Sequence, residues 1–140
     1  MIVLDTNIAS VLVGPEHPDI PIIEAWQQAS HDQDFRLTTV TLAEIAYGVA
    51  ILPDGARKRR LQEASKKLFS AVSTTALPFG VREAETYGTI MAKRRSQGHE
   101  ISQFDAQIAA IALVAGAVLA TRNTPDFTDC GVQLVNPYIS

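Results

Sequence analysis

The chain has 140 residues, of which 46% are hydrophobic and 19% are charged, and its net charge is -3. This composition predicts a compact globular protein and excludes an intrinsically disordered chain. Proteins that bind nucleic acid are usually basic, so any phosphate-binding surface on this chain must be local. The single cysteine, Cys130, excludes an intrachain disulfide and fits a reducing compartment.

The N-terminal segment and the hydropathy pattern predict a protein of the cytoplasm. Residues 1–5 contain no basic region, and their apolar run is too short for a signal peptide. The longest apolar run, residues 108–120, falls short of the roughly 20 residues that a membrane helix needs. We therefore expect a cytoplasmic protein without a membrane partner.

In the first third of the chain, short apolar runs alternate with amphipathic segments. Residues 2–4 predict a buried strand, followed by a helix that Asn7 caps and that runs to Leu12. A second helix is predicted over residues 20–29 and a second strand over residues 35–40. Thr41 and Glu44 have the spacing of a capping box, which predicts a helix to about Leu52 with Glu44 in its first turn.

The rest of the chain continues the alternation. Helices are predicted over residues 56–72 and 80–95, and a third helix follows a cap at Ser102. Strands are predicted over residues 117–121 and 132–135. Because strands alternate with helices throughout, we expect one α/β domain over residues 1–140, a three-layer α/β/α sandwich with a central, mostly parallel sheet.

Four acidic residues at four separate places each lie beside an apolar segment: Asp5, Glu44, Asp105 and Asp126. Functional sites in parallel sheets form beyond the carboxyl ends of the strands, so the predicted fold lets these acids converge there. A carboxylate beside buried structure carries a large desolvation cost, and no cation is close in sequence to the first three acids. A hard divalent cation such as Mg²⁺, which prefers oxygen ligands, would compensate all four together.

Each acid taken singly also has an ordinary structural interpretation. Asp5 fits a helix cap, Glu44 fits a capping box, and Asp126 fits a turn before Phe127. Asp105 lies in the first turn of a predicted helix, where acids are common. What favours a shared site is the occurrence of all four acids in one ordered pattern.

Four segments together resemble the PIN-domain ribonucleases, and among them the VapC-type toxins of bacterial toxin–antitoxin pairs, including the FitB-like branch. The segments are Val3-Leu-Asp-Thr-Asn7, Thr41-x-Ala-Glu-Ile45, Asp105-Ala-Gln-Ile-Ala-Ala110 and Thr121-Arg-Asn-Thr-Pro-Asp-Phe127. Each segment alone is a weak signal, whereas their order and spacing are specific. The resemblance covers the whole chain, because its length and its order of elements also fit.

The resemblance implies a Mg²⁺- or Mn²⁺-dependent endoribonuclease whose catalytic and metal-binding acids are Asp5, Glu44, Asp105 and Asp126. It implies that Thr6, Asn7, Thr121 and Asn123 orient the acids or the substrate. Asn123 and Asp126 are both candidates for the fourth ligand, and we favour Asp126 because it can be anionic. One or two ions would bind, activating a water and stabilising the leaving oxygen. The resemblance further implies an RNA substrate, a homodimer, and a cognate antitoxin protein whose tail blocks the acidic site.

The basic residues have two interpretations. The candidates for contact with RNA phosphates or with the antitoxin are Arg57, Arg59, Arg60, Arg94, Arg95 and Arg122. The alternative is a solvated helix face, which we favour for Lys66 and Lys67. Arg122 lies within the fourth motif, where it would either touch phosphate or neutralise the acids.

Two other functions fit part of the pattern. Another Mg²⁺-dependent α/β enzyme of phosphate chemistry would also place an acid after its first strand. However, Asp5-Thr6-Asn7 lacks the second acid, two residues on, that aspartate-nucleophile phosphatases use. A non-catalytic PIN-fold binding module would keep the fold, but the presence of all four acids favours catalysis.

Overall fold

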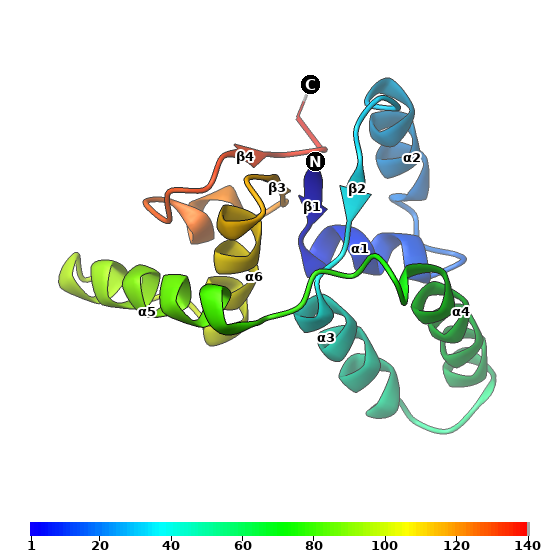
Figure 1. The fold of residues 1–140 in the computed structure, drawn as a ribbon. Coiled ribbons are helices and arrows are strands. Elements are labelled where there is room, and N and C mark those ends of the chain that lie inside the picture. Colours follow the sequence, from blue (N-terminus) through cyan, green and yellow to red (C-terminus); the bar gives the residue numbers. More distant parts are fainter. Residues whose placement is uncertain (140) are drawn as a thin grey trace.

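The computed structural model describes residues 1–139 and contains a four-stranded sheet with helices on both faces (Figure 1). The strands are β1 (Ile2–Leu4), β2 (Phe35–Arg36), β3 (Val118–Ala120) and β4 (Leu134–Val135). Their order is β2-β1-β3-β4, and each neighbouring pair is parallel. The predicted α/β fold with a parallel sheet is therefore confirmed.

Helical segments connect the strands. They are α1 (Thr6–Val13), α2 (Ile20–Ala29), α3 (Thr39–Ala50), α4 (Ala56–Val72), α5 (Val81–Ser96), α6 (Gln103–Val114) and the short 3₁₀ helix η1 (Thr124–Phe127). The predicted bounds of α2 and α4 are confirmed, and Ser102 caps α6 as expected. Every helix within residues 1–139 is too short or too polar to cross a lipid bilayer.

The two faces of the sheet bury two apolar cores. Successive side chains of a strand point to opposite faces, so Val3 packs on one side while Ile2 and Leu4 pack on the other. The core on the Val3 side includes Ile90 of α5 and the alanine-rich face of α6. The opposite core is built largely from α1, α2 and the inner face of α4, which lie together on one side of the strands in Figure 1.

The start of α3 differs from the sequence prediction. The strand expected over residues 35–40 ends at Arg36, because the Thr38 hydroxyl accepts a hydrogen bond from the Thr41 backbone N–H at 3.0 Å and so caps a helix beginning at Thr39. The predicted Thr41–Glu44 capping box is therefore wrong. Glu44 lies in the second turn of α3, where its carboxylate has no part in capping.

Smaller differences occur in three other elements. Asp5 caps α1 in place of Asn7, since the Asp5 side chain accepts a hydrogen bond from the Thr6 backbone N–H. The strands predicted over residues 117–121 and 132–135 are shorter, at Val118–Ala120 and Leu134–Val135. Because β3 ends at Ala120, the polar residue Thr121 lies directly at the edge of the sheet.

Candidate active site

The register of the sheet places Asp5 beside Thr121. Leu4 of β1 pairs with Ala120 of β3, so the next residue of each strand lies at the same edge. The Asp5 backbone N–H donates to the Ala120 carbonyl at 2.9 Å, which continues the ladder by one residue. At that point the Thr121 hydroxyl donates to Asp5 Oδ2 at 2.7 Å. Two residues that are far apart in sequence thus form the centre of the site.

Asp5 is a buried carboxylate that retains hydrogen-bond partners for both of its oxygens. Its side chain is 4% exposed, and Oδ1 accepts from the Thr6 backbone N–H at 2.8 Å. Burial raises the pKa of Asp5 to about 6, although the hydrogen bonds from Thr121 and Thr6 lower it; the charges of Asp105 and Glu44 raise it further. Asp5 caps α1, as its ordinary interpretation holds, and it also faces two other acids.

The Thr121 hydroxyl also contacts two further groups, one in α1 and one in the fourth motif. It accepts a hydrogen bond from Asn7 Nδ2 at 3.4 Å and another from the Asn123 backbone N–H at 3.0 Å. Since its single proton goes to Asp5, these contacts fix the direction of the hydroxyl. The predicted orienting residues Asn7, Thr121 and Asn123 are thus close together, and Asn123 contributes its backbone to this contact.

Glu44 reaches the site from α3 through a second pair of hydroxyls. The Thr6 hydroxyl donates to Glu44 Oε1 at 2.6 Å and lies 3.0 Å from the Thr41 hydroxyl. Because the only proton of Thr6 goes to Glu44, Thr41 is the donor to Thr6. The sequence pattern predicted a capping role for Thr41, which lies in the second motif, but did not assign it to the acidic site. Its position three residues before Glu44, on the same face of a helix, was the signal that it belongs to this group.

Asp105 and Asp126 approach the same place from the other side of the sheet. Asp105 lies in the first turn of α6, where its backbone N–H donates to the Ser102 hydroxyl at 3.1 Å. Burial raises the pKa of Asp105, a hydrogen bond with Ser102 lowers it, and the charges of Asp126 and Glu44 raise it further. Asp126 is exposed in η1, after β3. Asp105 is therefore the acid that is close enough to Asp5, Glu44 and Asp126 for their charges to interact.

The acids lack a compensating cation among the described residues. No lysine, arginine or histidine of residues 1–139 lies within ion-pair distance of any of the four. As they stand, no three acidic, imidazole or thiol groups of this part of the chain lie close enough together to hold one metal ion. The donor set of carboxylates and hydroxyls nonetheless fits a hard divalent cation by its chemistry, and Asp126 is the most exposed of the four acids.

The candidate basic residues have different surroundings. Arg94 is buried and donates to three backbone carbonyls, so its guanidinium is unable to contact RNA or antitoxin as expected from the sequence. Arg122 pairs with Asp19 at 3.4 Å and lies over the Tyr138 ring at 4.3 Å, so it does not neutralise the acids. Arg57, Arg59, Arg60 and Arg95 are exposed, and Arg60 lies 4.0 Å from Glu16.

Two aromatic side chains that sequence reasoning did not assign to the site flank Glu44. Tyr47 is 68% exposed and Phe104 is 52% exposed, and with Ala43 and Glu44 they line a hollow of about 450 Å³. Phe104 directly precedes Asp105, and Tyr47 follows Glu44 by one turn of α3. In the sequence, the only signal was the position of each aromatic residue close to a candidate acid.

Comparison with known proteins identifies the family. The PIN domain family matches residues 2–129. The chain is 34% identical over 139 residues to VapC ribonuclease Y4jK of Sinorhizobium fredii, covering 99% of this chain and 98% of that protein. It is 33% identical to toxin FitB of Neisseria gonorrhoeae, with 99% of both chains covered. The FitAcB crystal structure from Neisseria gonorrhoeae superposes with a TM-score of 0.88 at 32% identity, covering 100% of both chains. This chain therefore belongs to the PIN domain family, in the group that includes VapC- and FitB-like proteins.

Proposed function

We propose that this protein is the toxin of a toxin–antitoxin pair and that it cleaves RNA phosphodiester bonds with the help of Mg²⁺ or Mn²⁺. The observation that carries the proposal is that Asp105 lies close enough to Asp5, Glu44 and Asp126 for their charges to interact, while no cation of residues 1–139 lies beside any of the four. The likeness to a VapC ribonuclease and to toxin FitB supports the same activity.

The four acids would hold the divalent ion, with Asp5 and Asp105 as the central pair. When bound, the ion would activate a water, polarise the scissile phosphate and stabilise the leaving oxygen. The protein supplies the orientation of the ligands. Thr6 and Thr121 fix the two oxygens of Asp5, and the Thr41–Thr6 hydroxyl pair fixes Oε1 of Glu44. The Thr6 N–H and the Thr121 hydroxyl donate to Asp5, and the Thr6 hydroxyl donates to Glu44, so these groups favour the ionised carboxylates that bind a cation.

The hollow between Tyr47 and Phe104 suits unpaired bases of an RNA strand. Exposed aromatic rings stack on bases that are splayed out of a single strand, and such stacking tolerates different sequences. The hollow borders Glu44, so a nucleotide stacked there would have its phosphate near the acids. The exposed Arg57, Arg59, Arg60, Arg95 and Arg122 remain candidates for contact with more distant phosphates.

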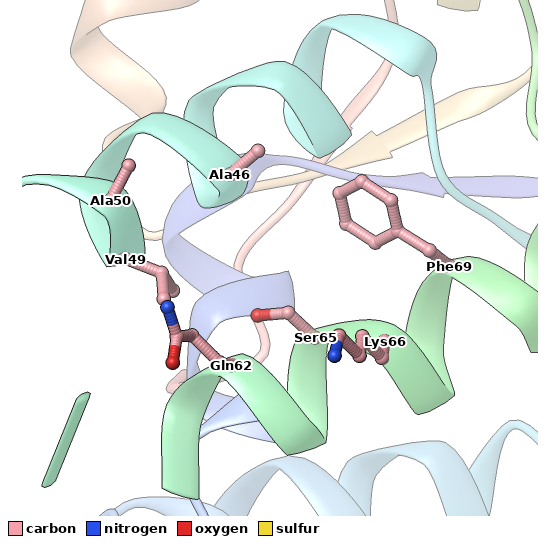
Figure 2. A pocket seen from close by; sticks show the side chains of 7 residues that line it. All are labelled: Ala46, Val49, Ala50, Gln62, Ser65, Lys66 and Phe69. Carbon is pink, nitrogen blue, oxygen red and sulfur yellow. The ribbon is translucent and has the colours of Figure 1, made fainter. Parts of the chain in front are cut away.

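An antitoxin partner would cover the apolar groove between α3 and α4. Figure 2 shows Ala46, Val49 and Ala50 of α3 facing Gln62, Ser65, Lys66 and Phe69 of α4 across this groove. The groove has a volume of about 450 Å³ and a mainly apolar lining. An apolar segment of the antitoxin would remove this surface from water, and Lys66 at its rim would pair with an acidic residue. We also expect the protein to be cytoplasmic and to form a homodimer. Light scattering on the purified protein would test the dimer.

Cleavage of a labelled RNA pool by the purified protein tests the proposed activity. Reactions would contain Mg²⁺, Mn²⁺ or EDTA, with Asp5→Asn and Asp105→Asn beside the wild type and Asp32→Asn as an exposed control. We expect cleavage that requires metal and that both site variants lose by more than the 10–100-fold typical of outer-shell residues. The control should cleave at the wild-type rate.

Two outcomes would favour the alternative functions. A covalent phosphate on Asp5 after incubation with a phosphoryl donor would indicate an aspartate-nucleophile enzyme in place of a nuclease. A folded, inhibitor-free protein that cleaves no RNA with either metal, and whose expression slows growth no more than that of Asp5→Asn, would indicate a binding module.

A further inference from the structure

Arg94 of α5 is buried without an acidic partner. Its side chain is 5% exposed, and no aspartate or glutamate of residues 1–139 lies within ion-pair distance of its guanidinium. A buried charge carries a large desolvation cost, and an apolar residue of similar volume would often serve the fold as well or better. The arginine therefore calls for a reason beyond filling the core.

All three guanidinium nitrogens donate to backbone carbonyls of segments outside α5. Nε donates to the His99 carbonyl at 2.9 Å and Nη2 to the Glu100 carbonyl at 3.4 Å. Nη1 donates to the Thr128 carbonyl. His99 and Glu100 belong to the loop between α5 and α6, and Thr128 directly follows η1. One side chain thus ties two separate segments to α5.

These two segments carry two of the four acids. The loop leads to Ser102, whose hydroxyl caps α6 by accepting from the Asp105 backbone N–H at 3.1 Å. The 3₁₀ helix η1 contains Asp126, two residues before Thr128. Asp105 and Asp126 repel each other, so the acids need an external restraint to stay close. The guanidinium of Arg94 binds the loop that precedes Asp105 and the residue that follows η1, which contains Asp126.

We propose that Arg94 is a positioning residue that fixes the spacing of Asp105 and Asp126 and so sets the affinity of the acidic site for its divalent cation; this inference rests on the proposed function. A planar guanidinium holds its donors in a rigid fork, so it binds carbonyls in several directions at once. The ammonium of lysine is a single point with flexible geometry. A lysine at this position would keep the charge and lose the link between the two segments.

The test compares Arg94→Lys and Arg94→Met with Arg82→Met, which removes an exposed arginine from the same helix. Calorimetry would measure the Mn²⁺ dissociation constant of each protein without RNA, and steady-state kinetics would then give kcat and KM for RNA. Outer-shell residues typically change metal affinity or activity by about 10–100-fold. We expect both Arg94 variants to bind Mn²⁺ more weakly by a factor in this range. Their kcat should fall, while their KM for RNA should stay unchanged. Arg82→Met should match the wild type in Mn²⁺ affinity.

Three results would overturn the inference. The first is an unchanged Mn²⁺ affinity in the two Arg94 variants, and the second is a kinetic change confined to KM, which would show that Arg94 does not act through the metal site. The third is the failure of both variants to fold even at low temperature, which would leave Arg94 a purely structural role. Because Mn²⁺ binding is measured without RNA, a wild type that cleaves nothing would reject the nuclease and still leave this test readable.

Discussion

Thr121 organises the acidic site at the scale of single residues. Its hydroxyl donates to Asp5 and accepts from Asn7 and from the Asn123 backbone. Removing the hydroxyl would leave a buried carboxylate without one of its donors and two other groups without their acceptor. A hydrogen bond to a charged group contributes about 1.5–3 kcal/mol to stability. Replacing the Thr121 hydroxyl with a methyl group therefore tests all three of these hydrogen bonds together.

Thr121→Val should lower the free energy of unfolding by about 1.5–3 kcal/mol. It should also reduce RNA cleavage by about 10–100-fold, since Asp5 would lose its fixed orientation. Urea denaturation and initial cleavage rates would measure the two effects. The control is Thr89→Val, an exposed position on α5, which should change stability by less than about 0.5 kcal/mol. Full activity in Thr121→Val would show that the hydroxyl does not orient Asp5 for catalysis.

The raised pKa of Asp5 predicts an unusual pH dependence of stability. Burial raises the pKa of Asp5 from 3.8 to about 6, so the folded protein binds this proton more tightly than the unfolded chain does. Without metal, stability should therefore fall as the pH rises from about 4 to about 6, by an amount of order 3 kcal/mol, and then level off. Asp105, whose pKa is also raised, adds to the same trend.

Urea denaturation of EDTA-treated protein between pH 4 and pH 8 would measure this dependence. Asp5→Asn removes the titrating group, so its unfolding free energy should fall less than that of the wild type over the same range. A wild type and an Asp5→Asn variant with parallel pH profiles would contradict the assignment of the raised pKa to Asp5.

The limits of sequence reasoning are clearest at Arg94. In the sequence, Lys93, Arg94 and Arg95 form an ordinary basic run near the end of a helix, and such runs are usually solvated. The buried Arg94 contacts three carbonyls, and the one of Thr128, 34 residues along the chain, is a contact that no local pattern encodes. Asp5 after the first strand and Asp105 in the first turn of a helix lie where the sequence predicted them, because both follow recognisable element boundaries. The role of the four acids as metal ligands stays a prediction. Their hydrogen-bond partners depend on sheet register, and only the polar character of those partners was predictable.

At the scale of elements, the start of α3 decides what Glu44 does. The alternating pattern of residues 35–40 indicated a longer strand, but the Thr38 hydroxyl satisfies the Thr41 N–H and begins the helix at Thr39. Local patterns describe such boundaries poorly, because a cap and a strand end use the same polar residues. Glu44 is consequently left without a capping role, and the hydroxyl of Thr6 orients it within the acidic site.

Substitutions in α3 would separate these two roles. Thr38→Val should lower the free energy of unfolding by about 0.5–2 kcal/mol, because it removes the cap. Glu44→Gln should change stability by less than about 0.5 kcal/mol in EDTA, since Gln still accepts from Thr6 and loses a charge that other acids repel. Its RNA cleavage should nonetheless fall. A large loss of stability in Glu44→Gln with intact cleavage would restore the capping interpretation.

At the scale of the whole molecule, the acidic site joins the two sides of the sheet. Asp5 lies at the junction of β1 and α1, and Glu44 belongs to α3, whereas Asp105 and Asp126 belong to α6 and η1, which pack on the Val3 face. A cation held by all four would therefore link the two cores. Binding of a ligand to the folded state alone stabilises that state by mass action.

Mg²⁺ or Mn²⁺ should accordingly raise the thermal stability of the protein. At a free concentration 100 times the dissociation constant, the gain would be about 2.7 kcal/mol, which corresponds to a Tm increase of roughly 5–10 °C for a chain of this size. Differential scanning calorimetry at neutral pH would measure it. Asp105→Asn should lose most of the increase, while Asp32→Asn should keep it. An identical Tm in EDTA and in saturating metal would contradict a shared cation.

The most direct test of the central claim is the Mn²⁺ affinity of five proteins: the wild type, Asp5→Asn, Glu44→Gln, Asp105→Asn and Asp126→Asn. Loss of the free-Mn²⁺ signal in electron paramagnetic resonance would give each dissociation constant without any RNA. Because outer-shell partners already change metal affinity by about 10–100-fold, each of the four substitutions should weaken binding by at least tenfold. Wild-type affinity in either Asp5→Asn or Asp105→Asn would contradict the account, because the four acids would then not form one metal centre.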